Sequence, residues 1–252
     1  MTELNAMIVG GSSGLGFSIA KKLCLRGYKI SIVGKNVNKL RKVQNYINKK
    51  YKKKINILRY DLTNEKDSQS FLKIIEKNKT HYQILVYSAG MGFYENFSRS
   101  SNLMNEKVIK LNVLSFVNIV SFFVKHMLRH KKKSYIVPIG SLAGFVPDPS
   151  FLLYGSTKKF IEVFTVGLSE GLKKTNISLS LVTPGSMKTN FLKNSKNSKK
   201  GSSMDPDIAA GILINKFLSS KKIIVPGVIN TLRYYAFKFL PKKIIFYLFK
   251  NL

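Results

Sequence analysis

The sequence predicts a single α/β domain in which a parallel sheet is doubly wound, with helices on both faces. Short apolar runs of β type alternate with longer segments of helical spacing along most of the chain. That alternation is typical of βαβ units, and right-handed crossovers between such units give a doubly wound sheet. The 252 residues, 44% of them hydrophobic, are enough to bury a large core.

Each predicted element rests on its local pattern. The strands are short runs of aliphatic and aromatic residues, and the helices place apolar residues three and four apart. The predicted strands are 6–9, 29–33, 55–60, 84–87, 135–139 and 177–182, with a seventh candidate at 223–225. The predicted helices are 16–26, 37–50, 67–78, 106–130 and 154–174.

The chain is strongly basic, with 43 Lys and Arg against 12 Asp and Glu, a formal charge of +31. Such a balance suggests nucleic acid or an anionic membrane as a partner. The lysines are spread over the whole chain, however, and are densest at 49–54, 131–133 and 193–200. We therefore interpret most of the charge as background composition and expect no nucleic-acid partner.

Compartment is predicted from two further features. Cys24 is the one cysteine, which excludes an intramolecular disulfide and a cysteine-based zinc cluster. Residues 1–5 run directly into the first apolar strand without the pattern of a secretory signal. Both features favour the reducing cytoplasm.

A glycine-rich loop follows the first predicted strand, with the sequence Gly10-Gly11-Ser12-Ser13-Gly14-Leu15-Gly16. In a dinucleotide-binding turn, Gly10 would permit the tight turn, Gly14 the approach of a pyrophosphate, and Gly16 close packing of helix on strand. The following helix N-terminus would present its N–H groups to the phosphates. A glycine pattern alone also fits an ordinary strand-to-helix turn.

The end of the second strand bears on which dinucleotide would bind. An acidic residue there would accept hydrogen bonds from a ribose 2′-OH and favour NAD. The sequence is Gly34-Lys35-Asn36, without a carboxylate. Lys35 could pair with a 2′-phosphate, so the pattern favours NADP over NAD. The missing carboxylate is the stronger of these two indications.

A pair of residues at the start of the helix 154–174 suggests proton transfer. Tyr154 and Lys158 are four apart and share one helical face. A nearby ammonium stabilises a phenolate, so Lys158 would lower the pKa of Tyr154 and suit it as a general acid. Ser141 follows the strand 135–139, where parallel sheets bind ligands. A Tyr-x3-Lys pair by itself is usually structural.

Four other motifs lie at matching places. They are Asp61-Leu62 after the third strand, Tyr87-Ser88-Ala89-Gly90 after the fourth, Asn112 within Lys110-Leu111-Asn112-Val113, and Pro184-Gly185-Ser186-Met187-Lys188-Thr189 after the sixth. In order and spacing, these motifs and the three described above resemble the short-chain dehydrogenase/reductase family, in its broad carbonyl and ketoacyl reductase subgroup.

The resemblance covers nearly the whole chain and implies a Rossmann-type domain with assigned site residues. The implied catalytic residues are Asn112, Ser141, Tyr154 and Lys158, with Ser141 and Tyr154 also binding substrate. The implied cofactor residues are Gly10, Ser12, Ser13, Gly14, Leu15, Gly16, Lys35, Asp61, Leu62, Ser88, Ala89, Gly90, Tyr154, Lys158, Pro184, Gly185 and Thr189.

The implied roles are coherent as chemistry. Ser141 would orient a carbonyl, and Tyr154 would donate a proton as hydride arrives from the nicotinamide. Lys158 would hold the ribose, and Asn112 would position a water that relays protons. Val9, Tyr87, Ser88 and Pro138 depart from the family pattern, which affects stability more than chemistry.

The predicted function is therefore NADP-dependent reduction of a carbonyl, or oxidation of the corresponding alcohol, on a hydrophobic or acyl-type substrate. The alternative is a non-catalytic nucleotide-binding module of the same fold with a membrane or partner-binding role. The resemblance also implies a homodimer or homotetramer.

We divide the chain into a reductase domain at 1–228, with a substrate lid at about 187–205, and an amphipathic C-terminal segment at 229–252. Residues 232–252 carry five basic side chains and no acidic one. The charges interrupt the segment too often for a membrane span, and Pro241 would break it into two helices. It would lie on the anionic inner face of a membrane, or else cover the active site or an interface between subunits.

Three histidines complete the inventory: His81, His126 and His130. The last two are four apart on a predicted helix, but no acidic cluster completes a ligand set. We therefore predict no metal and place these histidines on a helix surface near residues 131–133.

Overall fold

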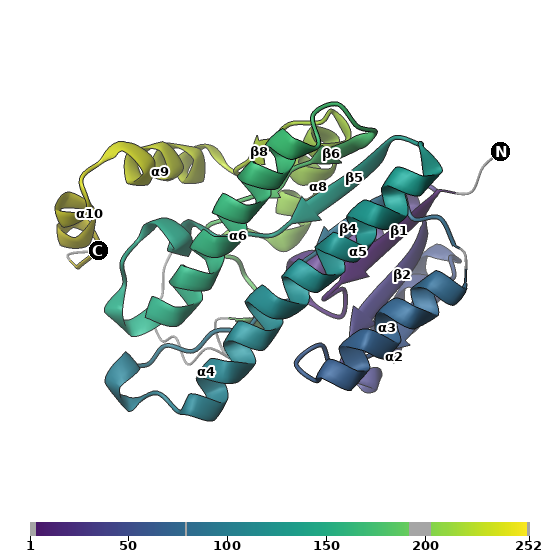
Figure 1. Ribbon diagram of the computed structural model, residues 1–252, viewed down its shortest axis with the longest axis horizontal. Coiled ribbons are helices and arrows are strands. Elements are labelled where there is room, and N and C mark those ends of the chain that lie inside the picture. Colours follow the sequence, from purple (N-terminus) through teal and green to yellow (C-terminus); the bar gives the residue numbers. More distant parts are fainter. Residues whose placement is uncertain (1–3, 79, 192–202, 251–252) are drawn as a thin grey trace.

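A parallel sheet crosses the centre of the computed structural model, which describes residues 4–78, 80–191 and 203–250 (Figure 1). Its six strands lie in the order β3-β2-β1-β4-β5-β6, and β7 and β8 form a short parallel pair beside them. The order reverses between β1 and β4, as a doubly wound sheet requires. The strands are β1 (Asn5–Val9), β2 (Lys29–Gly34), β3 (Asn56–Arg59), β4 (Ile84–Tyr87), β5 (Ser134–Pro138), β6 (Ile177–Leu179), β7 (Leu181–Val182) and β8 (Ile223–Ile224).

The predicted strand 177–182 is divided at Ser180. The Ser180 N–H still donates to Ile136 on β5 at 3.0 Å, whereas the Leu181 N–H donates to the Lys222 carbonyl at 2.8 Å. The strand thus changes partner at this residue, from β5 to β8. The predicted seventh strand is confirmed as β8, and a bridge from Val182 to Ile139 keeps the pair next to the main sheet.

Helices cover both faces of the sheet (Figure 1). They are α1 (Gly14–Leu25), α2 (Val37–Tyr51), α3 (Glu65–Lys77), α4 (Asn102–Ile109), α5 (Ser115–His130), α6 (Leu152–Gly171), α8 (Pro206–Leu218), α9 (Val228–Phe239) and α10 (Lys242–Lys250). The single predicted helix 106–130 is instead α4 and α5 joined by a π-helical turn at Lys110–Leu114.

The core has two layers because alternate strand residues face opposite sides of the sheet. Ile8 and Val86 face α1, α2 and α8, whereas Met7 and Leu85 face α3, α5 and α6. Parallel sheets need this double cover, and burying each large aliphatic or aromatic side chain contributes about 1.5–3 kcal/mol. The predicted fold class is confirmed.

The stretch from Asn102 to His130 has the length and mean hydropathy of a membrane span. Its side chains Phe116, Val120 and Phe123 are fully buried in the layer that packs on β4 and β5. That arrangement is the one found in a central core helix, which passes the same length and composition test.

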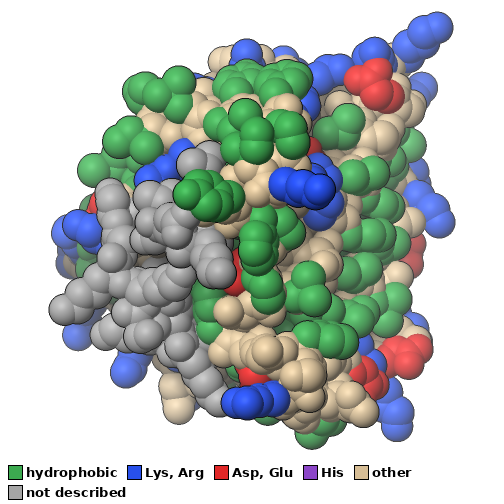
Figure 2. Space-filling model, turned by 90° about the vertical axis from the view of Figure 1, so that its left-hand side faces the viewer, with side chains coloured by type: hydrophobic (Ala, Val, Ile, Leu, Met, Phe, Trp, Pro, Cys, Tyr) green, Lys and Arg blue, Asp and Glu red, His purple; other side chains and the backbone are tan. Residues whose placement is uncertain are grey.

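The C-terminal segment forms the two predicted short helices, α9 and α10, and Pro241 lies between them. One face of α9 packs on the 3₁₀ turn Leu142–Phe145, with the buried Tyr234 ring 5.0 Å from the Phe145 ring. Apolar side chains gather on the face of the molecule that carries these helices (Figure 2). The exposed ones on α9 are Val228, Ile229, Leu232, Tyr235 and Phe239.

Candidate active site

A cavity of about 840 Å³ lies at the carboxyl ends of the central strands, where the strand order reverses. Ser141 and all the predicted cofactor residues except Gly16 line it. Gly16 has the predicted role of allowing close packing of helix on strand, because a Cβ at this position would lie 2.4 Å from the Gly10 carbonyl oxygen. Much of the predicted lid, residues 192–202, lies outside the described residues, as do all the lysines at 193–200.

The glycine loop forms a cradle for an anion. Gly10 has φ of +84°, and a Cβ there would lie 2.5 Å from the Ala89 backbone nitrogen. The Ser13 side chain makes no capping hydrogen bond to α1 among the described residues, whereas Asn36 caps α2. The first N–H groups of α1 are therefore free to meet a phosphate. These features fit a dinucleotide pyrophosphate.

The far end of the cavity is bounded by β2 and β3. Lys35 and Lys39 both line it, and sequence reasoning missed Lys39, since a single lysine in a lysine-rich helix carries no signal. Asp61 accepts hydrogen bonds from the Thr63 N–H at 3.0 Å and the Thr63 hydroxyl at 2.8 Å. Burial would raise the pKa of Asp61, but these bonds, with the charges of Lys35 and Arg59, lower it overall.

The predicted acid–base residues come together on the cavity wall. The Ser141 hydroxyl lies close enough to Tyr154 to lower its pKa, and the Lys158 Nζ lies 5.5 Å from the centre of the Tyr154 ring. That ammonium also donates to the Ile139 carbonyl at 2.8 Å. The hydroxyl of Ser141, a further potential donor, accepts from the Ala143 N–H at 3.1 Å. A carbonyl oxygen near Tyr154 would therefore meet two hydroxyl groups.

The prediction that the pKa of Tyr154 is lowered is wrong. The pKa of Tyr154 is raised, not lowered, because burial of the phenol outweighs the opposing effect of the Ser141 hydroxyl. Burial also lowers the pKa of Lys158 to about 8. The two groups share a site that disfavours both charges, so Tyr154 is protonated at neutral pH.

Asn112 lies in the π-helical turn and does not line the cavity. Its side chain accepts from the Met91 N–H at 2.9 Å and donates to the Met91 carbonyl at 2.8 Å and to Thr157 Oγ1 at 3.0 Å. The Tyr87 hydroxyl holds the same turn by donating to the Leu111 carbonyl at 2.6 Å. Asn112 thus fixes the loop after β4, and its role in a water relay stays a prediction.

Aromatic rings form the wall of the cavity beside Tyr154. The Tyr94 and Phe151 rings stack at 3.9 Å, Phe151 stacks on Tyr154 at 4.3 Å, and the Phe191 ring lies 5.2 Å from Tyr154. Arg233 and Phe237 of α9 also line the cavity. No local pattern could find Tyr94, Phe151, Arg233 or Phe237, because separate loops and the C-terminal helix bring them to the cavity.

The histidine prediction needs correction. His126 is buried, at 3% exposure, because its side of α5 packs on the core. The loop before β4 brings His81 beside it, so the three histidines form a cluster that could hold a metal ion. Sequence reasoning missed it because His81 lies 45 residues from His126 and joins it only through the sheet topology.

Comparison with known proteins shows the family to which the chain belongs. A family model described as short chain dehydrogenase matches residues 4–200. The chain belongs to this family and is a dehydrogenase/reductase.

An oxidoreductase of Staphylococcus epidermidis is 27% identical over 187 residues, which are 74% of this chain and 79% of that protein. The very-long-chain 3-oxoacyl-CoA reductase of Rattus norvegicus is 30% identical over 197 residues, or 75% of this chain and 61% of that protein. Among solved structures, a short-chain dehydrogenase from Sphingobium yanoikuyae in complex with NADPH superposes with a TM-score of 0.85 at 22% identity, over 93% of this chain and 92% of that one.

Proposed function

We propose that this dehydrogenase/reductase reduces the carbonyl group of an apolar or acyl-type substrate with NADPH. The observation that carries the proposal is the grouping of Ser141, Tyr154 and Lys158 on the wall of the cavity that begins at the glycine loop. The similarity to a 3-oxoacyl-CoA reductase supports an acyl-type substrate.

The proposed mechanism uses the chain's own groups as follows. Ser141 donates a hydrogen bond to the substrate carbonyl oxygen and holds the carbon in register for attack. Tyr154, protonated at neutral pH, donates its proton to that oxygen as negative charge develops. Lys158, held by the Ile139 carbonyl, stabilises the phenolate that remains. A bound nicotinamide supplies the hydride.

Two features support NADP over NAD. Lys35 and Lys39 place two cations at the end of the cavity beside β2. The strand end 34–36 has no carboxylate to accept bonds from a ribose 2′-OH. The NADPH complex of the Sphingobium yanoikuyae protein fits this proposal, although an NAD complex of a Burkholderia phymatum protein has the same fold.

Substrate class is proposed from the aromatic wall. Tyr94, Phe151 and Phe191 bury apolar surface next to Tyr154, and a hydrophobic substrate portion would fill this space. Arg233 at the same cavity could pair with an anionic group at the far end of an acyl substrate.

The direct test is a panel of carbonyl substrates, followed by NADPH oxidation, for wild type and Tyr154→Phe. Tyr235→Phe, on the exposed face of α9, is the matched control. Turnover by wild type and the control but not by Tyr154→Phe supports the proposal. NADPH binding without turnover of any substrate favours the alternative, a non-catalytic nucleotide-binding module.

Enzymes of this family commonly oligomerise, and we propose that this chain does so through α5 and α6. Both helices expose apolar side chains: Leu128 on α5, and Phe160, Val163 and Val166 on α6. Joining two such surfaces would remove them from water. Sedimentation of wild type as a monomer at micromolar concentration would contradict this part of the proposal.

We also propose that the enzyme works in the cytoplasm with α9 resting on an anionic membrane. The outer face of α9 exposes Ile229 and Leu232, and the charged residues of the segment 232–252 are all basic. Its inner face lines the cavity through Arg233 and Phe237, so a membrane could feed an apolar substrate to the site. Flotation with phosphatidylserine vesicles should fall in Leu232→Asp; equal flotation of both proteins contradicts membrane binding.

A further inference from the structure

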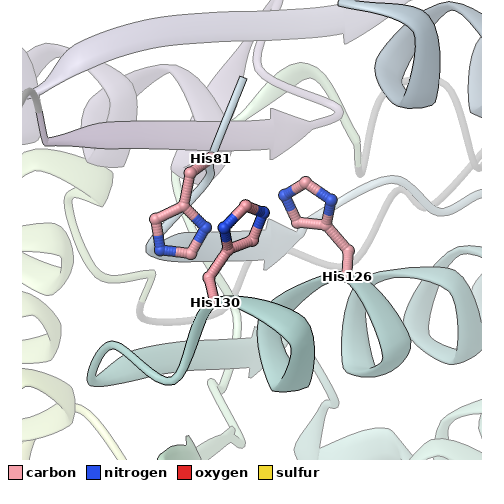
Figure 3. A group of neighbouring side chains, drawn as sticks. All are labelled: His81, His126 and His130. Atoms are coloured by element: carbon pink, nitrogen blue, oxygen red, sulfur yellow. The ribbon is translucent and has the colours of Figure 1, made fainter. Parts of the chain in front are cut away.

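All three histidines of the chain lie together near the amino end of β4, whereas the cavity lies at the carboxyl ends of the strands. His81 lies between α3 and β4, and His126 and His130 lie in the last two turns of α5. Figure 3 shows the His130 ring between the other two. Its centre lies 4.0 Å from that of His81 and 5.0 Å from that of His126.

The potential ligand atoms are close enough for one ion. One nitrogen from each ring lies within 4.8 Å of the others. Tetrahedral Zn²⁺ with bonds of about 2.0–2.1 Å places its ligand nitrogens about 3.3 Å apart. The rings would therefore need to approach by about 1.5 Å or less. His130 is exposed and His81 is in a loop, so both have room to adjust.

Several of these nitrogens lack good partners. Both ring nitrogens of His81 are buried without a hydrogen-bond partner in the described part of the chain. Nε2 of His126 accepts a long hydrogen bond, 3.4 Å, from the Tyr82 N–H. Buried polar atoms are nearly always paired, and an unpaired one costs free energy. A cation would satisfy the free lone pairs.

The protonation states also suit a cation. Burial and the charges of neighbours, His130 among them, together lower the pKa of both His81 and His126 to about 4. Both imidazoles are thus neutral at pH 7, the form that binds metals. The nearby Lys132 charge weakens a cation site, but water and salt screen an exposed lysine.

We propose that His81, His126 and His130 bind one late first-row divalent cation of the zinc or nickel class, with water completing its coordination. Imidazole ligands suit these metals, whereas Mg²⁺ and Ca²⁺ require oxygen ligands. The cation would join the loop before β4 to the end of α5, away from the cavity that the proposed function uses.

The test is titration of the untagged protein with ZnCl₂ in competition with a chromogenic chelator. Because the chain has three histidines, any imidazole-bound zinc belongs to this cluster. We expect one Zn²⁺ per chain for wild type and for Lys125→Gln, a matched exposed control on α5. His130→Gln, at an exposed position, should weaken binding by about tenfold or more.

A second measurement covers the case of a variant that folds poorly. Zinc bound to the folded state should raise the melting temperature of wild type and of Lys125→Gln but not that of His130→Gln. Absence of stoichiometric zinc binding to wild type, equal affinity in His130→Gln, or equal binding of Mg²⁺ would overturn the proposal.

Discussion

The position of the Tyr154 ring depends on the absence of a side chain at Gly92. A Cβ at this position would lie 2.6 Å from Cδ2 of Tyr154 and 2.8 Å from its Cγ. Carbon atoms pack at about 3.5–4.0 Å, so Gly92→Ala must displace the ring by about 1 Å. Gly92 is not among the glycines with positive φ, so alanine fits its backbone and the effect is purely steric.

That displacement should act on catalysis more than on binding of the cofactor. An error of about 1 Å in a catalytic group can cost about 10²-fold in rate, so we expect kcat/KM for carbonyl reduction to fall by about that factor. The overpacking should also cost about 1–3 kcal/mol of stability. The assay is steady-state NADPH oxidation, with the Kd for NADPH measured by its fluorescence.

Gly211→Ala on α8 is the matched control. Within 4 Å, a Cβ at Gly211 would meet only the end of the Lys22 side chain among the described residues, at the ordinary contact distance of 3.8 Å. Alanine should therefore leave kcat/KM unchanged and stabilise the helix by up to about 1 kcal/mol. If Gly92→Ala keeps the kcat/KM of wild type, the assignment of Tyr154 to the reacting group is refuted.

Three further predictions test separate parts of the molecule. Lys35→Glu should lower the ratio of kcat/KM for NADPH to that for NADH by about tenfold or more, because it replaces an attraction to the 2′-phosphate with a repulsion. An unchanged ratio would contradict the cofactor proposal. Asp207→Asn leaves the buried Lys21 without its ion-pair partner and should cost about 1–3 kcal/mol in urea unfolding. The exposed Glu170→Gln should cost less than Asp207→Asn, and equal losses would refute this ranking. Burial lowers the pKa of Lys158 to about 8 from an ordinary 10.5. Between these two pH values the unfolded chain binds more protons than the folded chain, so Lys158 makes the free energy of unfolding rise with pH. Lys158→Met should lose this contribution between pH 8 and 9.5, and a pH profile identical to that of wild type would contradict the prediction.

Local sequence patterns predicted the fold well because each main strand and the glycine loop has a recognisable local sequence. The strands β1, β2 and β4 are buried on both faces and read as apolar runs, and the glycine loop has its own sequence signature. The break at Ser180 was missed because it arises from a change of pairing partner, which depends on β8 more than forty residues away.

The site was predicted in part, for the same reason. Residues at strand ends and in the glycine loop were found, since their place follows from the topology. Phe151, Arg233 and the histidine cluster were missed because loops and helix ends distant in sequence assemble them. The direction of the Tyr154 pKa was wrong because the sequence showed its neighbour Lys158 but not the burial of both.

The Tyr154→Phe variant tests directly whether Tyr154 donates the proton during carbonyl reduction. The decisive measurement is kcat/KM for NADPH-dependent reduction, made beside the Kd for NADPH. We expect a loss of about 10²–10⁴-fold in kcat/KM in a variant that still binds NADPH. A variant that reduces the substrate as fast as wild type would contradict it.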